Sequence, residues 1–118
     1  MNELDFLRSL QAPFVTHLRI SDCIVRVAVN DRRLEKSVRS YFRPFLTSPA
    51  APAIRVIGAQ GEPLFDHSAL EDVQRAAGQP KMAYYDVPQA RVILKKRSGV
   101  VHYLRGNRCY AVGDLLRP

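Results

Sequence analysis

Residues 14–30, FVTHLRISDCIVRVAVN, decide the fold because they contain two strand-like runs on either side of a turn. Successive side chains of a β-strand point to opposite faces of a sheet, so Phe14 and Ile20 share one face of the first run. Ser21 and Asp22, between the two runs, are typical turn residues. The stretch therefore predicts a β-hairpin.

The next segment, residues 30–46, spaces its apolar residues by three and four instead of two. Asn30 or Asp31 can cap the start of a helix by accepting a hydrogen bond from a free backbone amide. The apolar side chains form one predicted stripe, which consists of Leu34, Val38, Tyr41 and Phe45. Pro44 cannot continue a regular helix, so the helix is predicted to end near Phe42.

The rest of the chain predicts a further strand, a second main helix and a series of strands. Residues 54–59 form a short apolar run, and the order strand, helix, strand allows a parallel crossover. Ser68 and Glu71 match a capping box, and Gly78 offers a stop for the helix that follows. Runs with a period of two then return, separated by turn residues, at residues 82–87, 90–97, 100–104 and 109–112.

Together these elements predict an α+β fold. Its sheet is expected to be mixed and mostly antiparallel, with an N-terminal hairpin, a helix crossover, a C-terminal meander and two main helices. A short additional helix is predicted within residues 1–11. The chain has 118 residues, which is the size of one domain, so residues 1–118 are predicted to form a single domain.

Cysteine usage and hydropathy predict a cytoplasmic protein. Cys23 and Cys109 lie far apart, each in an apolar run, and are expected to be buried residues without a metal or cofactor. Glu3 and Asp5 precede any apolar run, so no secretory signal is expected. No stretch approaches the ~18 apolar residues of a membrane span, so no membrane partner is expected either.

The charge of the chain favours an acidic partner. Eighteen basic and eleven acidic side chains give a formal net charge of +7. One sector of the predicted first main helix is entirely basic, and its residues are the leading candidates for binding an anion or a partner: Arg32, Lys36, Arg39 and Arg43. The alternative is an ordinary solvated helix face.

Two weaker basic clusters lie at turns of the predicted meander. Lys95, Lys96 and Arg97 precede one turn, and Arg105 and Arg108 flank the next. Successive hairpin turns lie at opposite ends of a sheet, so the presence of two basic turns does not by itself predict a single basic patch.

An RNA-binding sheet would also present aromatic side chains for base stacking. Tyr103 and Tyr110 are the nearby candidates, and both are equally compatible with a core or edge position.

No catalytic signature is visible in the sequence. The chain lacks a P-loop, a dinucleotide-binding glycine motif and the common zinc-protease and serine-hydrolase motifs. His17 and His102 lie on different predicted strands, and nothing joins them to His67. The chain alone is therefore predicted not to be an enzyme, and a small enzyme that uses Asp66, His67 or His102 is the least favoured alternative.

The segments HLRISDCIVRVAVNDRRLEKSVRSYFRPFL (residues 17–46) and LRGNRCYAVGDLL (residues 104–116) resemble the N-terminal region of HPr kinase-related proteins, in particular the HprK-related kinase B group. In that family a P-loop kinase domain follows this region. The sequence ends at Pro118 before any such loop, so the resemblance supplies no catalytic or nucleotide-binding residue.

The resemblance implies an accessory or regulatory domain, either part of a longer kinase or separately encoded. Its expected function is docking of a protein substrate, of the kinase domain or of a second copy. The alternative is an independent module that binds nucleic acid or another polyanion through the basic helix face.

Overall fold

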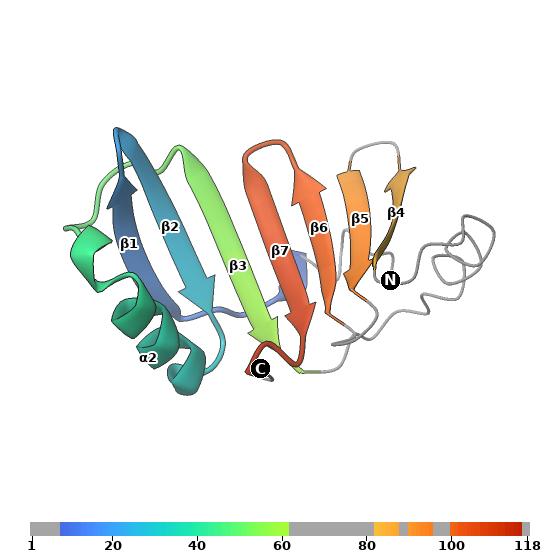
Figure 1. Ribbon diagram of the computed structural model, residues 1–118, viewed down its shortest axis with the longest axis horizontal. Helices are drawn as coiled ribbons and strands as arrows, with labels where there is room; N and C mark the ends of the chain where they lie inside the picture. Colours follow the sequence, from blue (N-terminus) through green and yellow to red (C-terminus); the bar gives the residue numbers. More distant parts are fainter. Residues whose placement is uncertain (1–7, 62–81, 88–89, 96–99, 117–118) are drawn as a thin grey trace.

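The computed structural model describes residues 8–61, 82–87, 90–95 and 100–116 (Figure 1). In these residues seven strands form one sheet with the spatial order β1-β2-β3-β7-β6-β5-β4. The strands are β1 (Phe14–Ile20), β2 (Cys23–Val29), β3 (Ile54–Gln60), β4 (Met82–Val87), β5 (Ala90–Lys95), β6 (Val101–Arg105) and β7 (Arg108–Gly113). Between β2 and β3 lie helix α2 (Arg32–Tyr41) and the 3₁₀ turn η1 (Arg43–Phe45).

The strand pairing confirms the predicted α+β class with a mixed, mostly antiparallel sheet. β1 and β2 form the antiparallel hairpin, and α2 connects β2 to β3, which pairs with it in parallel. The strands β4, β5, β6 and β7 form the antiparallel meander. The sequence pattern did not give the strand order, in which β3 pairs in parallel with β7 and joins the two halves of the sheet.

Helix α2 begins and ends close to the predicted residues. The backbone N–H of Arg33 donates to Oδ1 of Asp31 at 2.7 Å, so Asp31 is the N-cap. At the other end, Phe42 is the C-cap and Pro44 lies in η1, where the chain leaves the helix. The second predicted main helix, which begins at Ser68, lies outside the described residues.

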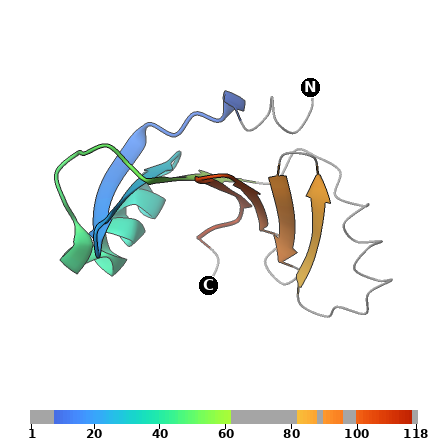
Figure 2. The same ribbon diagram turned by 90° about the horizontal axis from the view of Figure 1, so that it is seen from above.

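The sheet has different cover on its two faces. Figure 2 shows α2 and the C-terminal turn on one side, and on the other side the segment that leads into β1. The side chains of Thr16 and Leu18 are buried on the first side, which we call the α2 face. On the second side, the reverse face, a core cluster packs with Leu10 and Ile57 and consists of Ala59, Val92, Val101, Tyr103, Tyr110 and Val112.

Two expectations about burial need correction. The predicted helix stripe is buried at Leu34 and half-buried at Val38, but Tyr41 is 80% exposed because the helix and its packing end there. Phe45 is exposed as well. Cys23 and Cys109 are only half-buried. Cys23 is the first residue of β2, next to the exposed turn, and Cys109 lies on β7, whereas the helix packs mainly on β1 and β2.

We predict that Leu34→Ala lowers the free energy of unfolding by about 2–4 kcal/mol, because it removes buried apolar contacts and leaves a cavity under α2. Lys36→Ala, at an exposed position of the same helix, is the control and should change stability by less than about 0.5 kcal/mol. Urea unfolding followed by circular dichroism measures both. Equal losses in the two variants would contradict the described packing of the helix.

Candidate anion-binding site

Four neighbouring strands each place one arginine at the same level of the reverse face. Arg26 of β2 pairs with Arg55 of β3, and Arg55 pairs with Arg108 of β7. Arg108 in turn pairs with Arg105 of β6. Adjacent strands lie about 4.8 Å apart, so this set, the arginine row, extends about 14 Å across the sheet.

Local sequence explains the direction of the arginines. Arg26 and Arg55 each lie between two aliphatic residues. Because side chains alternate along a strand, these neighbours lie on the α2 face and the arginines on the reverse face. Arg105 and Arg108 flank a tight turn in which Gly106 has a φ of 56°, a conformation that favours glycine. The strand period therefore directs all four guanidinium groups to the same side of the sheet.

The turn between β6 and β7 is fixed against the start of β3. The backbone N–H of Arg55 donates to the carbonyl of Asn107 at 2.9 Å. The side-chain amide of Asn107 donates to the carbonyl of Ala53 at 3.2 Å. These bonds hold Arg105 and Arg108 beside Arg55.

Two hollows lie along the arginine row and share Arg8 and Arg108. The first has a volume of about 290 Å³ and is lined by Arg8, Leu10, Ala12, Arg26, Ala28, Arg55, Ile57, Arg108 and Tyr110. The second has a volume of about 420 Å³ and is lined by Arg8, Arg105, Gly106, Asn107 and Arg108. Arg8 comes from the segment that covers the reverse face, so five arginines surround the two hollows.

The hollows contain no compensating negative charge from the described part of the chain. In the described part of the chain, the arginines that form ion pairs are others, namely Arg32, Arg33 and Arg91. Within the seven strands as described, Asp86 is the one acidic residue, and it pairs with Arg91. Like charges directly opposite each other on neighbouring strands are destabilising, so the row is poised to gain from a bound anion.

The leading sequence candidates lie on the other side of the sheet. Arg32, Lys36, Arg39 and Arg43 are all exposed on α2 and η1. Arg32 forms an ion pair with Glu35 at 3.5 Å, and its guanidinium lies 4.5 Å from the centre of the Phe14 ring. Arg32 is therefore already engaged, and Lys36, Arg39 and Arg43 remain as the basic side chains of this surface, which we call the α2 surface.

The two weaker clusters separate in the structure. Arg105 and Arg108 belong to the arginine row, whereas Lys95 lies at the end of β5, near the opposite end of β6. Lys96 and Arg97 lie outside the described residues. The expectation that the two turns do not form one patch agrees with this strand arrangement.

Three residues around the hollows were not among the candidates predicted from the sequence, namely Arg8, Arg26 and Arg55. The available signal was an arginine in the middle of an apolar strand run, at positions 26 and 55. Only the pairing of β3 with β7 brings these arginines next to Arg108.

Neither tyrosine near the row offers a stacking surface. Tyr103 is 2% exposed and Tyr110 is 6% exposed, and both belong to the core cluster. Of the two alternatives left open for them, the structure selects the core.

Candidate catalytic and metal-binding groups are not brought together in the described ranges. By strand alternation, His17 lies on the reverse face and His102 on the α2 face. Asp66 and His67 lie outside those ranges. No group of three His, Cys, Asp or Glu side chains there is placed to hold a metal ion, and no helix within them has the length and apolar character to cross a membrane.

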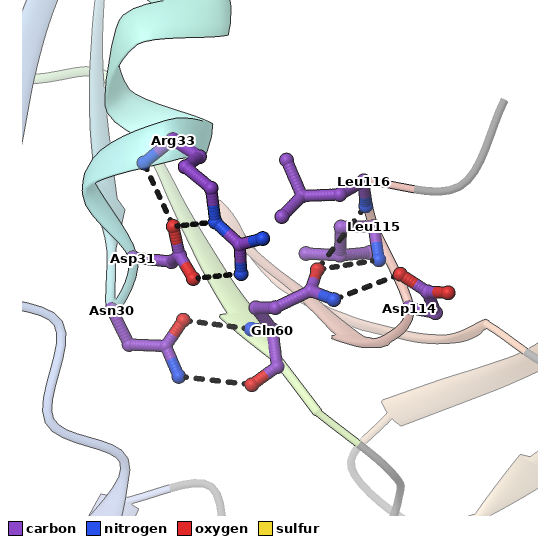
Figure 3. A network of polar contacts seen from close by, with 7 residues as sticks. All are labelled: Asn30, Asp31, Arg33, Gln60, Asp114, Leu115 and Leu116. Atoms are coloured by element: carbon purple, nitrogen blue, oxygen red, sulfur yellow. Dashed lines mark hydrogen bonds and ion pairs between the residues drawn. The ribbon is translucent and has the colours of Figure 1, made fainter.

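A second polar cluster lies at the carboxyl ends of the parallel strands (Figure 3), where open sheets often bind ligands. Asn30 accepts a hydrogen bond from the backbone N–H of Gln60 at 2.7 Å and donates to its carbonyl at 3.2 Å. The Gln60 side chain donates to Asp114 and accepts from the backbone N–H groups of Leu115 and Leu116. These groups satisfy one another, which indicates a structural role in fixing the C-terminal turn.

The same region contains an ion pair that also caps α2. Oδ2 of Asp31 lies 2.9 Å from Nη2 of Arg33, and hydrogen bonds from the Arg33 side chain and backbone lower the pKa of Asp31 below its usual 3.8. A carboxylate with a lowered pKa in the folded state stabilises the fold above pH 3.8, and this contribution disappears as the pH falls through the folded-state pKa.

We predict that Asp31→Asn is less stable than the wild type at pH 7 and that this difference shrinks as the pH falls through the folded-state pKa of Asp31, because asparagine keeps the cap acceptor but loses the charge. Thermal unfolding from pH 7 to pH 2 measures the difference. Asp22→Asn in the exposed β1–β2 turn is the control and should show a smaller pH-dependent difference. A difference that is constant with pH would contradict the role of the Asp31 charge.

A second prediction concerns repulsion within the arginine row. Arg55→Gln should raise the melting temperature by about 2–5 °C in low-salt buffer without phosphate or sulfate, because it removes two opposed charge pairs. Arg39→Gln on α2 is the control with the same change in net charge and should give a smaller shift. The advantage of Arg55→Gln should shrink as salt screens the row. A melting temperature below that of the wild type would contradict the repulsion.

Comparison with known proteins finds no relative of this chain. No protein-family model, curated protein or solved structure matches the chain. The resemblance to HPr kinase-related proteins therefore stays a prediction from the sequence.

Proposed function

We propose that this chain is a binding module for a multiply charged anion, which it holds on the arginine row. The observation that carries the proposal is the set of four in-register arginines without an ion-pair partner among the described residues. In this proposal the chain acts by binding and not by catalysis. Its two half-buried free cysteines fit a reducing, cytoplasmic location.

The chemistry of arginine supports an oxyanion ligand. A guanidinium group presents several N–H donors in a plane and binds phosphate or carboxylate through paired hydrogen bonds. A row of about 14 Å is longer than one such group requires, so the ligand is expected to carry at least two charges. Bringing negative charge to the row also removes the repulsion between its members.

The α2 surface favours a second candidate function, docking of an acidic protein partner. Lys36, Arg39 and Arg43 lie on the same short segment as the exposed rings of Tyr41 and Phe45. Arginine and aromatic residues are enriched in protein interfaces. This surface suits the accessory docking role expected from the resemblance to HPr kinase-related proteins, whether the partner is a substrate, a kinase domain or a second copy.

Paired charge variants separate the two surfaces. We expect inorganic tripolyphosphate to bind the wild type at low salt and R55Q/R108Q to bind it at least about tenfold more weakly, because each lost charge-assisted hydrogen bond costs about 1.5–3 kcal/mol. K36Q/R39Q removes the same charge from the α2 surface and should bind as the wild type does. Isothermal titration calorimetry gives the affinities.

Absence of tripolyphosphate binding at low salt would overturn the proposal of an anion site. An equal loss in the two double variants would overturn it as well, since binding would then follow net charge. Loss confined to K36Q/R39Q would move the anion site to the α2 surface.

A further inference from the structure

The two hollows along the arginine row differ in chemical character. The second is lined only by arginines and by the turn residues Gly106 and Asn107. The first combines four arginines with apolar side chains and Tyr110. A ligand that fills both must therefore present negative charge in each hollow and an apolar portion in the first.

Strand register explains how charge and apolar surface come to lie side by side. Ala28 of β2, Ile57 of β3 and Tyr110 of β7 are aligned, each two residues further along its strand than a member of the row. Two residues correspond to about 7 Å along a strand. Leu10 and Ala12, from the segment before β1, complete the apolar side of the first hollow.

Backbone pairing limits the kinds of polymer that fit. The row crosses β2, β3, β7 and β6, whose neighbours on both sides are strands of the same sheet. A peptide bound as an added strand requires an open sheet edge, and the row lies in the interior of the sheet. A polymer that binds here must therefore contact the arginine side chains through negatively charged groups. This requirement suits a polymer whose backbone itself carries negative charge.

We infer that the ligand is a nucleic-acid strand, with one backbone phosphate in each hollow and a sugar against Ile57 and Tyr110; this inference rests on the proposed anion-binding function. A nucleic-acid backbone combines phosphates with less polar sugars, which matches the arginines and apolar side chains that together line the first hollow. Arg8 and Arg108 line both hollows, so each is available to a phosphate in either one.

The same geometry makes binding independent of base sequence. Sequence-tolerant strand binders usually stack bases on exposed aromatic rings. Here Tyr103 and Tyr110 are buried in the core, so the hollows bind the backbone and the bases point away. Binding depends on charge, and its affinity falls as salt concentration rises.

Modified oligonucleotides of about twelve nucleotides test the inference with the full chain. Oligo-dT and oligo-dA should bind with affinities within about threefold of each other, and an abasic deoxyribose-phosphate oligomer should bind as well as they do. An oligo-dT with uncharged methylphosphonate links should not bind. For two phosphates the slope of log affinity against log salt should be about −1.4 for a single strand.

The charge variants connect this binding to the row. R55Q/R108Q should weaken oligo-dT binding at least about tenfold, whereas K36Q/R39Q should leave it within about twofold of the wild type. Circular dichroism spectra establish that both variants are folded. Fluorescence anisotropy of labelled oligomers gives the affinities.

Several results would overturn the inference. Loss of binding by the abasic oligomer would show recognition of bases, and an unchanged affinity in R55Q/R108Q would place the strand elsewhere. Binding of tripolyphosphate to the row without binding of any oligonucleotide would overturn the nucleic-acid assignment but leave the proposed anion site intact. Failure of both tripolyphosphate and oligonucleotides to bind would overturn both.

Discussion

The parallel pairing of β3 with β7 is the constraint on which the rest of the structure depends. It joins residues 54–60 to residues 108–113 and thereby unites the N-terminal hairpin and crossover with the C-terminal meander in one sheet. The core cluster on the reverse face crosses this junction, from Ala59 of β3 to Tyr110 and Val112 of β7. The arginine row crosses it as well, between Arg55 and Arg108.

The row is expected to cost some stability while no anion is bound. Arginine side chains are long enough to spread their charges into solvent, so the repulsion between strand neighbours is moderate and not prohibitive. The apolar alternation on the two faces and the bonds from Asn107 to the start of β3 hold the register despite this repulsion. An arrangement that costs stability and lies in a hollow is more typical of a binding surface than of a structural one.

Sequence patterns predicted much of the fold because its elements are set by local features. Apolar runs, most of them with a period of two, located every strand that the structure describes, and the cap candidates Asn30 and Asp31 together with Pro44 located the ends of α2. The candidate site was harder, because its residues come from four strands and from the segment before β1. Arg26 and Arg55 are 29 positions apart in the sequence, and no periodicity within either strand reveals that they are neighbours.

The position of the row across the β3–β7 junction gives it a mechanical consequence. A slip of one residue between these strands would turn Arg108 to the opposite face and separate it from Arg55. An anion that contacts both side chains can do so only in the observed register, so its binding would stabilise this pairing of β3 with β7. If the proposed anion binds there, its binding and the alignment of the two halves of the sheet are thermodynamically linked, so that each one strengthens the other.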